Sequence, residues 1–424
     1  MRSLKLARSL VLRLAQGLGK WFDVSSKARR WRRESGLVLL LMITGISPSH
    51  SMEVRGQVAL EHRQFFEQGN TGQAREQTSV TLEPEFYWEW QSGQSSITFT
   101  PFGRWDSLDD NRTHADIREL SYLYFADEFE FKVGISKVFW GVTESQHLVD
   151  VINQTDGVES VDGETKLGQP MIHLTWLQDW GTVEGFVLPY FRERTFASSS
   201  GRLGMPLLDS DSARYESSHA QRHIDIALRY SHSIDIWDLG FSLFQGTNRD
   251  PYLQGENPSA ITPVWVPYYA QMSQISTDIQ GIFGDWVWKL EALYRDSLDT
   301  STAVTGGFEY TFIGVLDTSW DIGVLAEYLY DSRGKSAPVI GQNDGFVGMR
   351  WVANDMVGTE VLFGVTQDFD YSDSRTARVE ASSRIGNAWR WNVNVWWFNS
   401  DDQQDPLYLY RTESFAEVAL TYYY

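Results

Sequence analysis

The sequence predicts an all-β protein: a transmembrane, antiparallel, up-and-down β-barrel of about 18 strands with no plug domain. Two observations support this prediction. Segments of about ten to fifteen residues alternate between apolar and polar side chains over almost the whole chain after residue 51, and a strand places successive side chains on opposite faces. The connections between these segments are alternately long and short, as expected for a barrel whose two rims face different compartments.

The alternation is clear in segment 128–140, where Phe129 and Phe131 lie on one face and Glu130 and Lys132 on the other. A soluble β-sandwich also alternates, but its strands run about 5–6 residues, whereas a tilted membrane strand needs about 9–11. The segments of this chain are of the longer kind, and their aromatic residues concentrate near the ends of the apolar faces. Such positions are typical of the two interfacial girdles of a membrane barrel.

Eighteen segments have the pattern of strands. They are 53–66, 77–91, 95–107, 114–126, 128–140, 171–180, 182–195, 222–233, 236–246, 267–282, 284–297, 301–313, 318–331, 342–353, 358–369, 374–386, 388–400 and 411–424. The connections after odd-numbered segments are mostly long, and those after even-numbered segments are mostly tight. Bacterial barrels of one chain have an even number of strands, and the segment boundaries also allow 16 or 20.

Residues 1–51 are expected to be a cleavable export leader, and residues 52–424 the barrel. The leader holds ten of the 36 Lys and Arg residues and two of the 56 Asp and Glu residues, so the remainder carries a net charge of −28. A basic region is followed by an apolar stretch from Gly36 to Ile46 and then by small polar residues up to Ser51, the order of a secretory signal. The apolar stretch is shorter than the roughly 20 residues of a membrane-spanning helix; a short membrane anchor is the alternative.

The last strand ends on an aromatic residue. Its apolar face carries Val418, Leu420, Tyr422 and Tyr424. This pattern resembles the signal in the final strand that the barrel-assembly machinery recognises, although Phe is the more usual last residue. Over residues 52–424 the chain resembles the porin-like outer-membrane proteins of Gram-negative bacteria, and segment 132–170 is similar to one found in poorly characterised members. The resemblance implies a place in the outer membrane after export and signal cleavage, contact with its lipid and lipopolysaccharide, and a homo-oligomer such as a trimer.

Several kinds of chemistry are not supported by the sequence. The absence of cysteine excludes disulfides, cysteine nucleophiles and thiolate metal sites. The acidic balance argues against nucleic-acid binding. Neither an H-E-x-x-H nor a G-x-S-x-G motif occurs, and His219 and His223 are expected in a loop. We therefore expect no catalytic residue, no metal and no cofactor.

The function predicted for the chain is a passive channel for small hydrophilic solutes. By resemblance to porins, the long connection 141–170 could fold into the lumen and narrow it. Its acidic residues are the candidate constriction, and two arginines that follow the hairpin of segments 171–180 and 182–195 could face them. These residues are Glu144, Asp150, Asp156, Glu159, Asp162, Glu164, Arg192 and Arg194. Because carboxylates in a narrow, low-dielectric pore concentrate cations, we expect a preference for cations. The alternative is that 141–170 lies outside, as a lid or a contact between protomers.

The polar faces of the strands supply candidates for the lumen wall. They are Glu130, Lys132, Lys289, Glu291, Arg295, Asp321, Glu327, Arg378, Glu380 and Arg384. Three other functions remain open from the sequence: a sugar-selective porin, an outer-membrane enzyme, and a non-conducting structural or adhesion barrel. The sugar-selective alternative depends on aromatic residues inside the channel. Trp396 and Phe398, on the polar face of their strand, are the aromatic residues that fit it.

Overall fold

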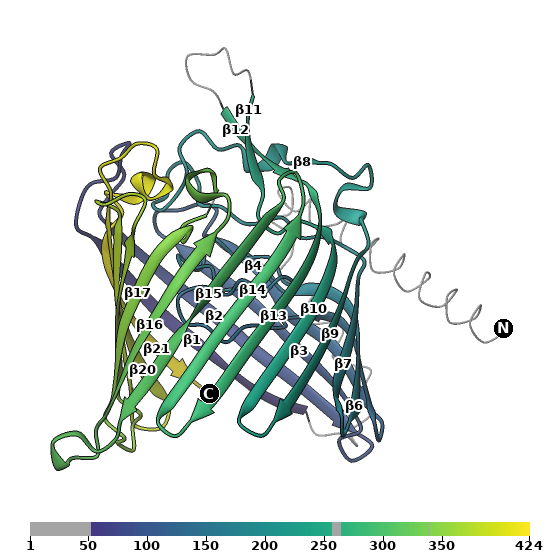
Figure 1. The fold of residues 1–424 in the computed structure, drawn as a ribbon. Helices are drawn as coiled ribbons and strands as arrows, with labels where there is room; N and C mark the ends of the chain where they lie inside the picture. Colours follow the sequence, from purple (N-terminus) through teal and green to yellow (C-terminus); the bar gives the residue numbers. More distant parts are fainter. Residues whose placement is uncertain (1–51, 257–263, 338) are drawn as a thin grey trace.

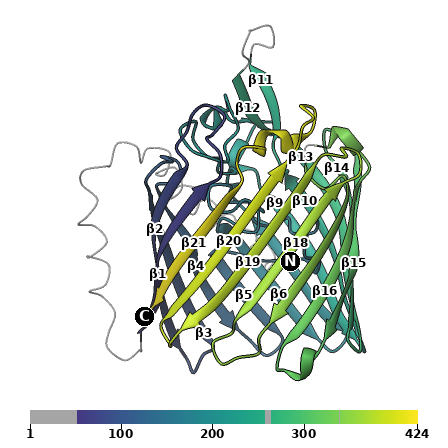
Figure 2. The same cartoon turned by 90° about the vertical axis from the view of Figure 1, so that its left-hand side faces the viewer.

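The computed structural model describes residues 52–256, 264–337 and 339–424; the expected leader 1–51 lies outside the described residues. Eighteen strands form one closed antiparallel sheet (Figures 1 and 2), in which each barrel strand pairs with its neighbours in chain order. The last strand pairs with the first, from Gln57↔Tyr423 to Phe65↔Phe415, and this seam closes the barrel. The predicted class, an up-and-down barrel of about 18 strands, is confirmed.

The barrel strands match the eighteen predicted segments one for one. They are β1 (Met52–Phe65), β2 (Glu76–Trp90), β3 (Ser95–Asp106), β4 (His114–Phe125), β5 (Phe129–Ser136), β6 (Gln169–Gln178), β7 (Gly181–Leu188), β9 (Asp225–Ile234), β10 (Trp237–Thr247), β13 (Gln271–Phe283), β14 (Trp286–Asp296), β15 (Ser301–Phe312), β16 (Asp321–Asp331), β17 (Asn343–Val352), β18 (Glu360–Asp368), β19 (Arg375–Ile385), β20 (Trp389–Asn399) and β21 (Phe415–Tyr423). Four ends differ from prediction by four residues or more: β13 begins at Gln271, β21 begins at Phe415, β5 stops at Ser136 and β7 stops at Leu188. At the last two places the chain leaves the wall.

The two rims differ as predicted. Tight turns join the strands at one rim, and the long connections gather at the other. There a small sheet stands above the barrel (Figure 1), made of β8 (Arg214–Tyr215), β11 (Tyr252–Glu256) and β12 (Val264–Tyr269). The helical segments of the described residues are 3₁₀ turns: η3 (Ser210–Ser212), η4 (Ala220–Arg222), η5 (Val315–Asp317), η6 (Gly334–Ser336) and η7 (Pro406–Tyr410). None of the helices in this part of the chain is long and apolar enough to cross a bilayer.

The polarity of the barrel is the reverse of that of a soluble protein. Large apolar side chains such as Leu228, Ile275 and Trp288 are exposed on its outer surface, whereas polar side chains such as Gln274 and Glu291 are buried inside. A wall that is apolar outside and polar inside matches a sheet surrounded by lipid. The alternation that predicted the strands is therefore the alternation between the lipid-facing and the lumen-facing surface.

Candidate functional site

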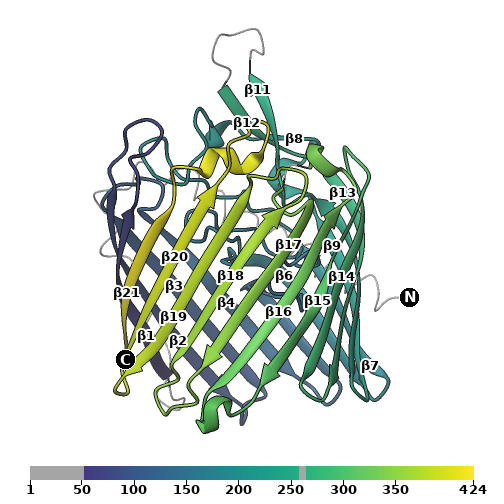
Figure 3. The ribbon, with the colours of Figure 1, turned by 60° about the vertical axis from the view of Figure 1, so that its left-hand side comes forward.

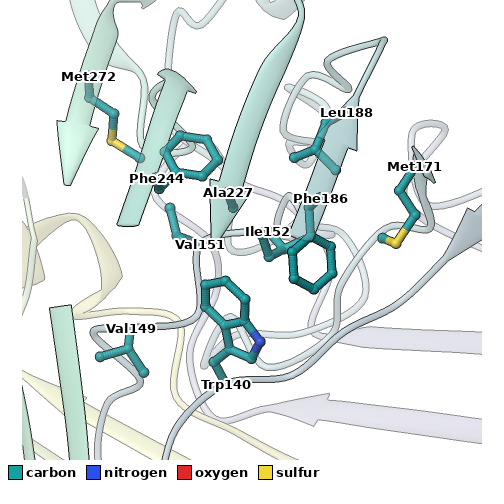
Figure 4. Close-up of a cluster of buried hydrophobic side chains, with 10 residues drawn as sticks. All are labelled: Trp140, Val149, Val151, Ile152, Met171, Phe186, Leu188, Ala227, Phe244 and Met272. Atoms are coloured by element: carbon teal, nitrogen blue, oxygen red, sulfur yellow. The ribbon is translucent and has the colours of Figure 1, made fainter. Parts of the chain in front are cut away.

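The connection between β5 and β6, residues 137–168, turns into the barrel and packs against one side of its inner wall. Its buried apolar residues contact side chains from β6, β7, β9, β10 and β13 (Figure 4). The cluster consists of Trp140, Val149, Val151 and Ile152 from the connection and Met171, Phe186, Leu188, Ala227, Phe244 and Met272 from the wall. Burying one large apolar side chain contributes about 1.5–3 kcal/mol. This apolar part of the wall is what holds the connection, hereafter the inner loop, inside the lumen.

Two buried ion pairs fix the inner loop to the wall near its own strands. The Asp156 carboxylate lies 2.6 Å from Nη1 of Arg118 on β4. Glu159 lies 2.7 Å from Nη2 of Arg104 on β3, and the same guanidinium contacts Glu61 on β1 at 2.5 Å. Charge-assisted pairs of this kind are strong when both groups are desolvated and satisfied. They hold residues 156–159 against β3 and β4.

The tip of the inner loop reaches the opposite wall at Glu291 on β14. This side chain is fully buried and accepts hydrogen bonds from three backbone N–H groups, those of Val142 (2.7 Å), Thr143 (3.0 Å) and Val149 (3.2 Å). The Thr143 hydroxyl donates a fourth at 2.8 Å. Gly141 has a φ of +147°, which favours glycine, and a Cβ atom there would lie 3.0 Å from the same carboxylate. Glu291 thus anchors the turn of the loop.

A second wall carboxylate, Glu327 on β16, anchors the next residues of the tip. It accepts hydrogen bonds from the N–H groups of Glu144 and Ser145, both at 2.8 Å, and from the Ser145 hydroxyl at 2.5 Å. The Glu144 carboxylate itself contacts Arg350 on β17 at 3.0 Å and Arg378 on β19 at 3.4 Å. The inner loop therefore crosses the lumen from β5 to the wall formed by β14–β19.

Residues 151 and 152 are held by an arginine that sequence reasoning did not single out. The Arg249 guanidinium donates to the carbonyl groups of Val151 and Ile152, each at 3.1 Å. It also forms an ion pair with Asp225 at 2.7 Å. Arg249 follows β10 in a connection, where the alternation of a strand gives no information on side-chain direction.

A polar cavity of about 200 Å³ remains between the inner loop and the wall β17–β20, a part of the barrel that Figure 3 shows from outside. Glu144 and Glu164 line it from the loop. The wall contributes Arg350, Glu360, Val361, Leu362, Arg378, Glu380, Ala381, Ser382, Arg390, Asn392 and Asn394. We call this space the lane. It exists on this side because the apolar cluster and the ion pairs with Arg104 and Arg118 hold most of the inner loop against the other side of the wall.

Solved structures share this architecture. A BenF-like porin from Pseudomonas fluorescens Pf-5 has a TM-score of 0.51 at 11% identity, covering 90% of this chain and 99% of that chain. The chain has the fold of the outer-membrane porins. OccK11 (OpdR) of Pseudomonas aeruginosa has a TM-score of 0.47 at 10% identity, over 88% of this chain and 95% of that one. Wzi of Escherichia coli is described as a carbohydrate-binding β-barrel involved in group 1 capsule assembly. It has a TM-score of 0.49 at 9% identity, over 87% of this chain and 84% of that chain. No protein-family profile matches the chain, and no curated protein matches it.

The structure separates the six predicted constriction carboxylates. Glu144 and Glu164 line the lane. Asp156 and Glu159 form the buried ion pairs described above, so they are anchors of the loop rather than free charges. Asp150 is buried 3.4 Å from Lys166, and burial raises its pKa despite that lysine. Asp162 is exposed and accepts hydrogen bonds from the loop itself. The expected ring of free carboxylates is therefore not formed, because Glu144, Asp150, Asp156 and Glu159 all have basic partners.

The two predicted arginines pair with carboxylates outside the inner loop. Both follow the end of β7 rather than lying on it, which corrects the predicted strand 182–195. Arg192 contacts Asp116 on β4 at 2.8 Å and donates to the Gly168 carbonyl at 2.9 Å. Arg194 lies 3.8 Å from Asp250.

The candidates for the lumen wall have different surroundings. Glu291 and Glu327 hold the loop, and Arg378 and Glu380 line the lane. Of the others, Lys289 pairs with Glu309 at 3.5 Å, Arg295 pairs with Asp250 at 3.3 Å, and Asp321 accepts a hydrogen bond from Asn354 at 2.7 Å. Glu130 and Lys132 are half-buried on β5, and Arg384 is exposed on β19 opposite Arg390. The lane residues that sequence reasoning missed, Glu360, Arg390, Asn392 and Asn394 among them, lie on the polar faces of β18 and β20, so strand alternation could have found them.

The sequence singled out two further groups, and the structure adds a third. Val418, Leu420, Tyr422 and Tyr424 are exposed on the outside, next to the β1–β21 seam. Trp396 and Phe398 point inward and stack with ring centroids 5.9 Å apart, but Phe398 is buried with Phe65, Leu407 and Phe415. Because of this packing, the Phe398 ring does not line the channel as the sugar-selective alternative requires. Within the described residues, His114, Asp156 and Glu159 could group around a metal ion, but Arg118 and Arg104 already neutralise the two carboxylates.

Proposed function

We propose that the protein is a passive outer-membrane channel for small hydrophilic solutes and that the inner loop narrows it. The observation that supports this proposal is the division of the lumen. Apolar packing and buried ion pairs hold the loop on one side, and a cavity lined by charged and amide side chains remains on the other. A lumen with this lining suits hydrated solutes, because polar groups of the wall replace water as hydrogen-bond partners.

The selectivity that we propose is a weak preference for cations. Four glutamates line the lane, Glu144, Glu164, Glu360 and Glu380, against the three arginines Arg350, Arg378 and Arg390. The excess of one negative charge attracts cations, but neighbouring arginines oppose it. A ring of free carboxylates would give a stronger preference, but Asp150, Asp156 and Glu159 have basic partners.

Single-channel recording in planar bilayers tests both parts of this proposal. Protein folded in detergent should insert and conduct in steps, with a reversal potential on the cation-selective side in a salt gradient. The double change Glu164→Gln and Glu380→Gln should move the reversal potential toward the anion side, and more so at low salt, where the Debye length is long. Glu309→Gln, on β15 beside Lys289, is the control. A chain that inserts and never conducts would contradict the channel.

The remaining parts of the proposal concern the route to the membrane and assembly. We propose that residues 1–51 direct export and are removed, and that Val418, Leu420, Tyr422 and Tyr424 present the assembly signal. Mass spectrometry of the mature protein should give the mass of a chain that begins near residue 52. Replacing Tyr422 and Tyr424 by Ser should lower the amount of barrel in the outer membrane. Native mass spectrometry in detergent measures whether the barrel is a trimer or another assembly.

A further inference from the structure

The wall of the lane carries charges of both signs in close alternation. Along β19, successive lumen-facing residues are Arg378, Glu380, Ser382 and Arg384. Such residues are about 6.8 Å apart, because a strand rises about 3.4 Å per residue. Across the sheet, Leu362 of β18 separates Arg350 from Glu380 in one row. Charged side chains of opposite sign are therefore neighbours on this wall.

Most charged side chains of the lane are accessible, and the pair of Glu360 with Arg390 is an exposed one. The side chains of Arg350, Glu360, Glu380 and Arg390 are 34%, 45%, 38% and 35% exposed. Glu360 and Arg390 meet at 3.2 Å, whereas Glu380 lies 3.3 Å from Arg378, whose side chain is only 10% exposed. Exposed pairs contribute little, since water competes for both partners. A charged group of a solute can therefore take the place of Glu360 or Arg390 in this pair at small cost.

Neutral polar groups lie among these charges. Ser382 accepts a hydrogen bond from Arg390 at 2.6 Å, and the amides of Asn392 and Asn394 also line the lane. A hydroxyl or an amide can both donate and accept, so it can bind either an anionic or a cationic group of a solute.

This arrangement affects solutes with a single charge differently from zwitterions, which carry one charge of each sign. A monoanion or a monocation is attracted by one side chain of opposite charge and repelled by the neighbouring side chain of the same charge. A solute with one cationic and one anionic group a few bonds apart finds a partner for each. We propose that the lane selects small zwitterions over monoanions and monocations of the same size. The proposal depends on the channel function proposed above.

Radiolabelled uptake into liposomes that contain the folded full chain tests this selection with two matched pairs of solutes. Taurine and isethionate share a sulfonate and differ in an ammonium against a hydroxyl group. Glycine betaine and choline share a trimethylammonium group and differ in a carboxylate against a hydroxymethyl group. Zwitterion selection predicts that taurine enters faster than isethionate and that glycine betaine enters faster than choline, each by about threefold, the factor expected of one exposed ion pair.

Selection by net charge would give a different result. A cation-preferring channel passes taurine faster than isethionate but choline faster than glycine betaine, so opposite signs in the two comparisons would overturn the proposal. Equal rates within each pair would overturn it as well. Arabinose serves as the neutral reference. If arabinose does not enter, the channel function itself fails; if it enters and the zwitterions show no advantage, only the present proposal fails.

A charge-neutral double variant locates the selection in the lane. Arg390→Gln with Glu360→Gln removes one charge of each sign and leaves the anchors of the inner loop in place, so the advantage of both zwitterions should disappear. The matched control is Arg55→Gln with Glu85→Gln, an exposed pair at 2.6 Å on β1 and β2 outside the cavity. It should keep the advantage. If the advantage persists in the lane variant, or disappears in the control, the assignment to the lane is wrong.

Discussion

Removing the charge of the two wall carboxylates should release the tip of the inner loop. Glu291 accepts four hydrogen bonds from the tip and Glu327 accepts three. A hydrogen bond to a charged group contributes about 1.5–3 kcal/mol and one between neutral groups about 0.5–1.5 kcal/mol. Each Glu→Gln change therefore loses about 1 kcal/mol per bond, or about 3–4 kcal/mol per anchor. This loss shifts the equilibrium between a seated and a released tip about a hundredfold or more.

The expected readout is the single-channel conductance of the double variant Glu291→Gln with Glu327→Gln. Residues 150–160 should stay in place, because three sets of contacts are unchanged in the variant. These are the apolar cluster around Trp140, the hydrogen bonds that Arg249 donates, and the ion pair of Asp156 with Arg118. The tip, residues 141–149, should move, raising the mean conductance and the current noise. Glu309→Gln again serves as the control. If the folded variant, judged by its heat-modifiable mobility on gels, conducts with the parent's conductance and noise, the anchoring argument is refuted.

Three other predictions follow from the same contacts. Arg118→Met leaves the Asp156 carboxylate buried without its partner, which costs about 3–5 kcal/mol, and urea unfolding followed by tryptophan fluorescence should show a midpoint lowered accordingly. Leu228→Arg, on the outer face of β9, should cost about 2–4 kcal/mol in a bilayer, whereas Ser231→Arg, facing the lumen, should be tolerated; equal costs would show that the assigned faces are wrong. Burial by itself lowers the pKa of His147, but Glu291, at 3.8 Å, Glu164 and Asp150 outweigh it and raise that pKa above the ordinary value of about 6.5. The protonated ring therefore stabilises the seated tip fully below about pH 6.5 and loses this effect as the pH rises through the raised pKa. Current noise should therefore increase as the pH rises above about 6.5, and it should be independent of pH in His147→Gln.

The sequence by itself determined the barrel. A strand exposes alternate residues to lipid and to the lumen, so the information is local and repeats within every segment. Leu228 and Arg229 on β9, or Trp288 and Lys289 on β14, already indicate the two faces without any knowledge of neighbours. The alternating long and short connections indicate the up-and-down topology, and the aromatic final strand indicates where the barrel closes. Both features are also local in the sequence. Consequently all eighteen strands were predicted, with boundaries mostly within a few residues.

The destination of the inner loop and the state of its charges were decided only by the tertiary structure. In the sequence, Asp156 and Glu159 look like free charges of an acidic loop. In the structure they pair with Arg118 and Arg104, which lie 38 and 55 residues earlier in the chain. The apolar residues Phe186, Phe244 and Met272 face the lumen, and they hold the loop against one side of the wall. Pairings of this kind depend on barrel closure, which brings distant strands around one lumen. Local alternation shows that a side chain points inward, whereas only the closed barrel decides what it meets there.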